Sequence, residues 1–345
     1  MKTVNGKKWL SILLAAVMVL ALLAGCGGEG ATEAESVTWR IQSSYPPGDQ
    51  CWDVQMPMIC ERLTEATDGY LQFELYQPGA ICEPDETPTM LSKGLLDAAL
   101  TAPNHTAGLI PAAYAEQGVP FLWQDGQDVY DTYYDYGLLD FVRDEYAKAD
   151  IYYGMYVPNG AYMIMTNFPV TTASDFVGKK LRASTTFGMF IEQLGGLPVV
   201  MSGGDIYMGM RLGTIDGNIY TVCELETSKL MEVTKYLIEP AVGGSAPVNL
   251  SISMKSWNAL PDDIKDIVNE TMQDMFMDIY EASISFDKSA IKAGVEYGTK
   301  INTIPEENLQ PFYDAAAAVI EKCKKEYPAA APGYDIIERW QADNK

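Results

Sequence analysis

The sequence has a single histidine, and this scarcity narrows the chemistry that the chain can carry out. His105, within TAPNHTAG, is the one imidazole in 345 residues, and no nucleophile motif stands near it. A serine or cysteine nucleophile activated by histidine would therefore have one base available and no partner beside it. Zinc sites usually combine histidines with closely spaced cysteine pairs, and no CxxC occurs. We expect no histidine-based catalytic dyad and no zinc site.

Cysteines are also few and scattered. Five of the six lie beyond residue 50: Cys51, Cys60, Cys82, Cys223 and Cys323. An exported chain can form disulfides, and an odd number leaves at least one thiol unpaired. Cys51 and Cys82 are a candidate pair, because both fall in predicted loops that could meet at one edge of a sheet. Buried free thiols are the alternative, and the sequence leaves the pairing open.

Basic residues are scarce. Lysines and arginines number 24 against 47 acidic residues, so the net charge is −23. Nucleic acid is excluded as a partner, because a phosphate backbone requires a basic surface. Only six residues are arginines, and Arg182 stands in GKKLRAS, which we predict to be a strand. A guanidinium without a partner is costly in a buried strand, so Arg182 requires an explanation.

Motifs of the common catalytic classes are missing. VGGSAPV, residues 242–248, contains Gly-x-Ser without the closing glycine of a nucleophile elbow. No phosphate loop or dinucleotide fingerprint follows a predicted strand. Acidic residues are abundant, so spacing alone leaves open a carboxylate pair of the glycosidase kind. We predict that the protein is not an enzyme.

The first 25 residues predict an export signal. Three lysines precede an apolar run over residues 10–23 that is too short for an ordinary membrane span. Leu-Ala-Gly-Cys at 23–26 resembles the lipobox of bacterial lipoproteins, which implies that Cys26 is lipidated; a plain signal peptide with an incidental cysteine is the alternative. Residues 26–36 are small and acidic, which predicts a flexible tether. We expect an extracytoplasmic domain of net charge −26, anchored by lipid to the bacterial cell membrane.

The remaining chain alternates strand and helix patterns, which favours an α/β fold with parallel strands. We expect strands at 37–42, 70–76, 97–102, 179–183, 198–201 and 214–217. KGLLDAAL (93–100) and LGTIDGNI (212–219) echo one another. Gly94 and Gly213 would each end a helix, and Asp97 and Asp216 would each open a strand. The echo predicts two lobes built on similar plans.

Residues 261–293 read as one long helix running along both lobes, of about 50 Å; two helices with a break near Ser283 or Ser285 are the alternative. We predict a first lobe over 37–160 with part of about 245–285. The second lobe would cover 161–244 with part of the C-terminal region to 345. Such a chain without a catalytic set suggests a binding protein whose ligand lies in a cleft between the lobes.

The sequence resembles the extracytoplasmic solute receptors of TRAP transporters, the DctP-like substrate-binding proteins. TTASDFVGKKLRAS (171–184) and LGGLPVVMSGGDIYMGMRLGTIDG (194–217) carry the most specific part of the resemblance. It implies a periplasmic-binding-protein-like fold with two α/β lobes and a long helix spanning both. It also implies a small organic acid as ligand and membrane subunits as partners. The family's arginine at the position of Arg182 pairs with the ligand carboxylate; an ion pair with Asp175 or Asp216 is the alternative.

Other candidates for the cleft follow from their positions in loops and at strand ends. Each could equally be plain packing or a solvated loop residue. They are Tyr45, Trp52, Asn104, His105, Tyr162, Ser184, Thr185, Asn218 and Tyr220.

The chain departs from the family pattern at two positions. Ile219 stands where relatives that bind a metal beside the ligand have a glutamate, so we predict no metal bridge and no cofactor. Tyr162 lies near the position where many relatives have a second polar or cationic residue. Both departures favour a monocarboxylate ligand. A zwitterion or amine held in an aromatic cage, and a ligand-sensing or enzymatic lipoprotein on the same scaffold, are the alternatives; the ligand's identity and the oligomeric state remain open.

Overall fold

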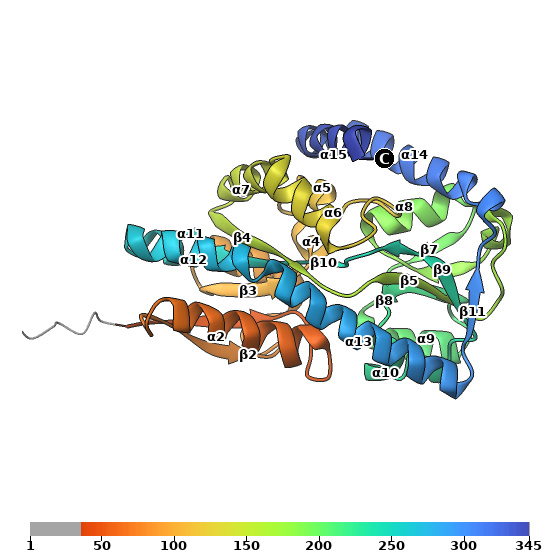
Figure 1. Cartoon of the computed structure of the whole chain (residues 1–345), viewed down its shortest axis with the longest axis horizontal. Helices are drawn as coiled ribbons and strands as arrows, with labels where there is room; N and C mark the ends of the chain where they lie inside the picture. Colours follow the sequence, from red (N-terminus) through yellow and green to blue (C-terminus); the bar gives the residue numbers. More distant parts are fainter. Residues whose placement is uncertain (1–35, 345) are drawn as a thin grey trace, which may run out of the picture. The chain divides into compact units, whose positions relative to one another are not determined.

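Two mixed β-sheets organise the chain (Figure 1). The computed structural model describes residues 36–344, so the predictions for the signal, for Cys26 and for nearly all of the tether lie outside the described residues. From Thr38 onward the chain forms one compact unit. Within the described part, no helix is both long and apolar enough to cross a membrane.

The first lobe is built around a sheet with the strand order β2-β1-β3-β10-β4. Its strands are β1 (Val37–Ser43), β2 (Leu71–Tyr76), β3 (Ala98–Thr101), β4 (Ile151–Pro158) and β10 (Pro247–Ser253). The second lobe has the order β11-β9-β5-β8-β6-β7. Its strands are β5 (Tyr162–Thr166), β6 (Lys180–Arg182), β7 (Leu197–Val199), β8 (Gly217–Thr221), β9 (Tyr236–Gly243) and β11 (Lys300–Thr303).

Helices follow most strands, as the alternating pattern predicts. The longer and better-formed ones are α2 (Met56–Ala66), α3 (Thr87–Ser92), α4 (Pro103–Thr106), α5 (Ala113–Gln117), α6 (Gly126–Tyr130), α7 (Leu138–Ala147), α8 (Thr185–Gln193), α9 (Ile206–Arg211), α10 (Glu224–Thr227), α11 (Met254–Asn258), α12 (Asp262–Asp274), α13 (Phe276–Tyr297), α14 (Gln310–Glu326) and α15 (Ala331–Asn344). Short π or 3₁₀ turns are η1 (Cys51–Gln55), η2 (Pro84–Glu86), η3 (Asp131–Asp135), η4 (Ala173–Phe176), η5 (Gly203–Asp205), η6 (Leu230–Glu232), η7 (Glu306–Asn308) and η8 (Pro328–Ala330).

The sheets are mixed, so the expectation of parallel strands is wrong in part. β1 pairs with β3, and β6 with β7 and β8, in parallel. β10 runs antiparallel to β3 and β4, and β5 runs antiparallel to β8 and β9. The reason is that the chain crosses between the sheets twice through short links, at 159–161 after β4 and at 244–246 after β9. Each crossing delivers a strand that enters the next sheet against the direction of its neighbours.

The internal echo in the sequence corresponds to a repeated structure. Gly94 and Gly213 have φ of 64° and 71°, the left-handed conformation in which glycine ends a helix without steric cost. Asp97 accepts a hydrogen bond from the backbone N–H of Arg40 on β1 at 3.0 Å. Asp216 accepts one from the N–H of Lys180 on β6 at 2.9 Å. An equivalent aspartate therefore joins an equivalent pair of parallel strands in each lobe: Asp97 joins β3 to β1, and Asp216 joins β8 to β6.

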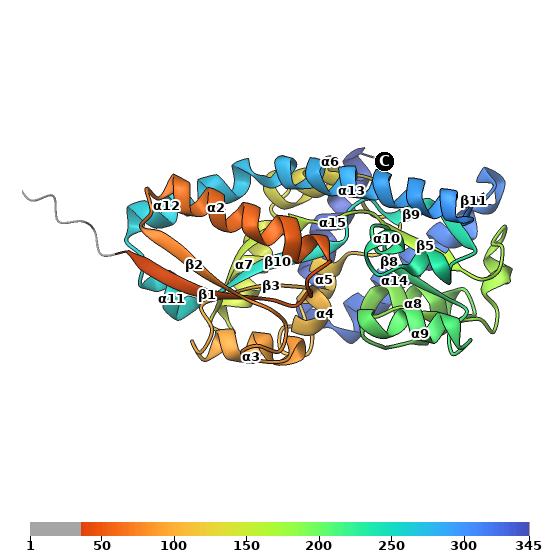
Figure 2. The same ribbon diagram turned by 90° about the horizontal axis from the view of Figure 1, so that it is seen from below.

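The predicted long helix is two helices, α12 and α13, which follow one another past both lobes (Figures 1 and 2). The break lies at Met275, which ends α12 with φ −80° and ψ −7°, and not at Ser283 or Ser285. Ser283 is instead a buried anchor within α13, because its hydroxyl accepts from Gln55 Nε2 at 2.8 Å and lies 3.1 Å from the Pro158 carbonyl oxygen. α13 contacts β4 of the first lobe and α10 of the second.

Polar side chains hold the first crossing in place. Asn159 accepts a hydrogen bond from Gln50 and donates to the Cys51 sulfur at 3.2 Å. The N–H of Ala161 donates to Asp287 Oδ2 on α13 at 2.7 Å. The crossing therefore depends on side chains from the first lobe and from α13.

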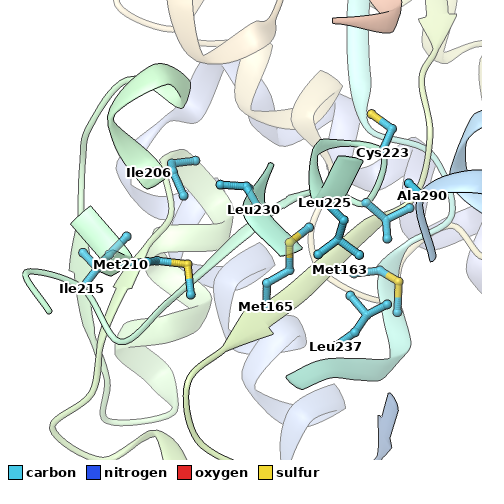
Figure 3. Close-up of a cluster of buried hydrophobic side chains, with 11 residues drawn as sticks. Met163, Met165, Ile206, Met210, Ile215, Cys223, Leu225, Leu230, Leu237 and Ala290 are labelled. Atoms are coloured by element: carbon cyan, nitrogen blue, oxygen red, sulfur yellow. The ribbon is translucent and has the colours of Figure 1, made fainter. Parts of the chain in front are cut away.

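Each lobe has its own interior. Figure 3 shows the apolar cluster of the second lobe, in which the side chains of Met163, Met165 and Met210 lie among Leu225 and Leu230. The first lobe buries a carboxyl group as well as apolar side chains.

Glu116 of α5 is that buried group. Its Oε1 accepts from Asn249 Nδ2 at 2.6 Å, and the hydroxyl of Tyr146 also donates to it. Burial raises the pKa of Glu116 to about 7, although these hydrogen bonds act in the opposite direction.

Candidate ligand-binding site

Arg182 ends β6, between β8 and β7 in the second sheet. Its register partners are Asn218 on β8 and Val199 on β7, and both pairs are parallel. The carboxyl ends of neighbouring parallel strands therefore meet beside Arg182, and this is the edge at which α/β sheets commonly bind ligands. The prediction that Arg182 lies on a strand is confirmed, and its side chain is half-buried.

The guanidinium of Arg182 contacts carbonyl oxygens and an aromatic ring. Nε donates to the carbonyl of Met201 at 3.2 Å, and Nη1 donates to that of Ile219 at 3.4 Å. Its central carbon lies 4.8 Å from the ring centre of Tyr220, a cation–π geometry. Within residues 36–344, no ion pair joins Arg182 to a carboxylate.

The alternative role for Arg182, an ion pair with Asp175 or Asp216, is wrong. Asp175 accepts from the N–H groups of Thr171 and Thr172 at 2.7 and 2.9 Å and thereby caps η4. Asp216 is turned towards the N–H of Lys180. Arg182 is left as a half-buried cation that has no carboxylate partner among the described residues and contacts carbonyl oxygens instead.

Hydrogen-bond donors gather at the start of α8, three residues after Arg182. Ser184 occupies the N-cap position without a capping bond from its side chain. Thr185 has φ of 48°, which is strained for a β-branched residue. The hydroxyls of Thr185 and Thr186 are buried and make no hydrogen bond within the described part of the chain. The free N–H groups of a helix N-terminus favour an anion.

Tyrosines surround Arg182. Tyr162 packs edge-to-face on Phe187 of α8, with ring centres 5.1 Å apart. Burial raises the pKa of Tyr162 to about 12, and the positive charge of Arg182 acts in the opposite direction. Burial also raises the pKa of Tyr45 and of Tyr220 well above the ordinary value, and the nearby phenol of Tyr162 contributes to both increases. Tyr45, Tyr162 and Tyr220 thus belong to one neighbourhood, and their role in binding a ligand stays a prediction.

Two acidic side chains, one from each lobe, meet at the same place. Asp49 precedes η1 and is 6% exposed, and Glu224 opens α10 and is 2% exposed. Their carboxyl groups are hydrogen-bonded to one another, and burial, followed by the charge of Glu224, raises the pKa of Asp49 well above its ordinary value. Burial and the adjacent carboxyl group therefore favour the protonated form of Asp49. Together with Arg182 and the three tyrosines, Asp49 and Glu224 form what we call the Arg182 cluster.

The charged groups of the Arg182 cluster all change the pKa of one phenol, that of Tyr220. Glu224 and Asp49 raise the pKa of Tyr220 further than burial alone, whereas Arg182 lowers it. Tyr220 therefore lies near both Arg182 and the acid pair, and among the described residues no ion pair joins Arg182 to either acid.

Six predicted residues are not members of the Arg182 cluster. Of these, Ser184 and Thr185 adjoin Arg182 at the start of α8, and the N–H of Trp52 donates to the Asp49 carbonyl at 3.1 Å. Asn218 is fully buried and donates to the sulfur of Met210 at 3.1 Å, so it belongs to the core. His105 pairs with Asp85 on the first lobe at 2.5 Å, and Asn104 beside it is exposed. Trp52 is half-buried on η1, and no described contact connects it to Arg182.

The predicted disulfide between Cys51 and Cys82 is wrong. All five described cysteines are free and buried. Cys51 lies against the amide of Asn159, whereas Cys82 lies 3.5 Å from the amide of Gln42. The alternative of buried free thiols is confirmed.

Sequence reasoning missed Asp49 and Glu224. Asp49 resembles an ordinary acidic residue before a helix, and its Oδ1 does accept from the Cys51 N–H at 2.7 Å. Glu224 is one acid among many in a chain of net charge −23. Only the packing of the two lobes reveals that both are buried and adjacent.

Comparison with known proteins agrees with the fold. A solute-binding protein of Chromohalobacter salexigens is 24% identical over 91% of this chain and 94% of its own length. The ectoine-binding periplasmic protein TeaA of Halomonas elongata is 22% identical over 96% of each chain. The crystal structure of a TRAP periplasmic solute-binding protein from C. salexigens, with bound (S)-(+)-2-amino-1-propanol, superposes with a TM-score of 0.78 at 20% identity. The superposition covers 89% of this chain and 96% of that one.

The family model DctP, described as bacterial extracellular solute-binding protein, family 7, matches residues 43–326. This range includes both sheets, both crossings and the Arg182 cluster. The relatives are substrate-binding receptors and not enzymes. The chain therefore belongs to the bacterial extracellular solute-binding protein family 7, the solute receptors of TRAP transporters.

Proposed function

We propose that this receptor binds a small organic acid with one carboxylate through Arg182 and delivers it to the membrane subunits of a TRAP transporter. The observation that carries the proposal is the half-buried guanidinium that no anion neutralises. It stands where parallel strands end and α8 begins. The site would lie in a cleft between the lobes, since Asp49 comes from the first and Arg182 from the second.

The net charge of the chain implies that an anionic ligand must be bound by a nearby cation. A body of net charge −23 repels anions at long range. A planar guanidinium offers two parallel donors to a carboxylate, and enclosure strengthens that interaction. With Nε and Nη1 directed to carbonyls, the remaining N–H groups of Arg182 are available to a ligand.

The residues around Arg182 favour one carboxylate over two. Its described neighbours are tyrosines and acids. Ile219, at the position where some relatives have a metal-binding glutamate, is 2% exposed and contributes only its carbonyl oxygen. A second ligand carboxylate would therefore face Asp49 or Glu224 without a cation to neutralise it.

Calorimetry with pyruvate, benzoate and succinate tests this proposal. We expect a monocarboxylate to bind more tightly than succinate, and Arg182→Ala to weaken binding at least about 30-fold, since truncating one partner of an enclosed charge pair costs about 2 kcal/mol or more. Arg211→Ala is the matched control, because Arg211 is exposed on α9 and contacts Tyr207. Tight binding of succinate, or full affinity in the Arg182 variant, would show that the proposal is wrong.

The acid pair favours a second candidate, a ligand that carries an ammonium group as well as a carboxylate. Asp49 and Glu224 offer carboxyl oxygens within the Arg182 cluster, and an ammonium placed against them would favour the ionised form of Asp49. The C. salexigens structure with bound 2-amino-1-propanol shows that a protein of this fold can hold an amine.

β-Alanine and propionate, which differ by one amino group, separate the two candidates. A preference for β-alanine that disappears in Asp49→Asn would support the second candidate. Equal affinity for the two probes would leave the first candidate and remove the second.

We also propose that Cys26 carries the lipid anchor. The support is the lipobox-like sequence at 23–26. Cys26→Ser should release the protein from the membrane fraction into the soluble extract, and a protein that is soluble with Cys26 intact would contradict the anchor.

A further inference from the structure

A groove on the second lobe contains a buried acid that the proposed function does not use. The groove has a volume of about 740 Å³ and lies between α13, β9 and the segment 303–309. We call it the Asp287 groove. Its walls are mainly apolar and include Met163, Ile284, Ile291, Ile304 and Leu309. A volume of this size is in the range of small-molecule sites.

The Asp287 groove is separate from the Arg182 cluster. None of the six residues of that cluster lines it. Met163, which does line it, belongs to the apolar core on the α13 side of the sheet, where it lies near Leu225 and Leu237 (Figure 3). A ligand in the groove would therefore occupy a second position on the molecule.

Asp287 is the charged lining residue whose side chain is buried. It is 4% exposed, and its Oδ2 accepts from the Ala161 N–H at 2.7 Å. Its other oxygen, Oδ1, is buried and makes no hydrogen bond within residues 36–344. A buried carboxylate oxygen without a donor carries a desolvation cost of about 1–3 kcal/mol or more, so its presence requires an explanation.

Charges at the groove disfavour anions. Glu239 of β9 and Glu306 of η7 line it together with Lys288 of α13. Glu239 also accepts from the Thr303 hydroxyl at 2.9 Å. With Asp287 ionised, three negative groups oppose one positive group, so the complementary ligand is a cation.

We propose that the Asp287 groove is a second binding site, which takes a compact apolar amine in its ammonium form. The ammonium would donate to Asp287 Oδ1, and the hydrocarbon body would cover the apolar walls. An ammonium supplies the donor that Oδ1 lacks and the charge that the three acids favour. An apolar body removes the half-buried walls from water.

The pH dependence of binding should follow Asp287. Burial raises the pKa of Asp287 to about 7, while the bond from Ala161 opposes the rise. Glu239, Lys288 and Glu306 line the same groove, and the charge of Asp287 helps to raise the pKa values of Cys223 and Tyr280. An ammonium favours the carboxylate form, so amine binding should tighten as the pH rises through about 7 and should release a proton.

Calorimetry with 1-adamantylamine, 1-adamantanol and 1-adamantanecarboxylate tests the site, because the three probes share one apolar body. We expect the amine to bind to one site per chain, more tightly at pH 8 than at pH 6. We expect Asp287→Asn to weaken amine binding at least about tenfold, since the bond to a charged group is lost. The asparagine retains an oxygen for the Ala161 N–H.

Two further variants keep the proposal falsifiable if Asp287→Asn folds poorly. Ile291→Trp should fill the groove and abolish amine binding, whereas Asp49→Asn should leave it unchanged. Equal affinity for the alcohol and the amine, or full amine affinity in both groove variants, would overturn the proposal. Loss of amine binding in Asp49→Asn would place the amine at the Arg182 cluster and would also overturn it.

Discussion

The buried carboxyl of Glu116 should make the stability of this receptor fall as the pH rises from about 5 to 8. Glu116 is fully buried in the first lobe, and its pKa is about 7 against an ordinary 4.5. The folded protein therefore binds a proton that the unfolded chain has released over this range. Linkage then lowers the free energy of unfolding as the pH rises, and the stabilisation is complete only below about 4.5.

The size of the effect follows from the two pKa values. At a little over 1 kcal/mol per pH unit, their difference corresponds to about 3 kcal/mol. Most of this falls between pH 5 and pH 8. Glu116→Gln removes the titration but retains an oxygen for the 2.6 Å bond from Asn249. The variant should therefore lose about 2–3 kcal/mol less stability than the wild type over this interval.

Urea denaturation at pH 5 and pH 8 measures this difference. Asp49 and Asp287 also have raised pKa values, so the stability of Glu116→Gln will still change with pH. The test is therefore the difference in pH dependence between this variant and the wild type. Glu61→Gln is the matched control, because Glu61 is exposed on α2 and should leave the pH dependence as in the wild type. Identical pH dependence in Glu116→Gln and the wild type would refute the reasoning.

Three further predictions concern the fold. Gly213→Ala should lower the free energy of unfolding by about 1–2 kcal/mol, because the φ of 71° is unfavourable for alanine. The added Cβ meets nothing within 4 Å, so backbone strain is the only cause expected; an unchanged urea midpoint would contradict this. Ser283→Ala should lower the free energy of unfolding by about 1–3 kcal/mol, because Gln55 Nε2 loses its 2.8 Å acceptor. An unchanged melting temperature in calorimetry would contradict this. The described thiols should react with a thiol reagent only on unfolding, because Cys51 and the other four are buried; rapid labelling of the native protein would argue against this.

Local signals allowed much of the fold to be predicted. Local patterns located β1, β2, β3, β6 and β7, whereas the strand predicted at 214–217 meets β8 only at Gly217 and five other strands of the described chain were missed. The paired Gly-x-x-Asp segments predicted that the lobes share a plan. Gly94 and Gly213 do end helices, and Asp97 and Asp216 do tie equivalent strands. These features are predictable because a glycine at positive φ and a carboxylate facing an adjacent strand are determined within one supersecondary unit.

The errors have one physical origin, which is that local patterns do not report the course of the chain between lobes. β5 and β10 follow crossings, so their antiparallel direction depends on which sheet they enter. Ser283, suspected as a break, is held inside α13 by Gln55 from the first lobe. Asn218 follows Asp216 by two positions, but its side chain is buried against Met210 of α9, a contact that depends on how that helix packs on β8.

The sequence by itself determined the family, the acidic character of the chain and the strand that carries Arg182. A motif and a charge count suffice for these, because they depend on residues close together in the chain. Only the tertiary structure placed Asp49 beside Glu224, left Arg182 without an anion and buried Asp287 with one free oxygen. Each of these depends on burial, and burial of a charged side chain is decided by segments from distant parts of the sequence that exclude water together.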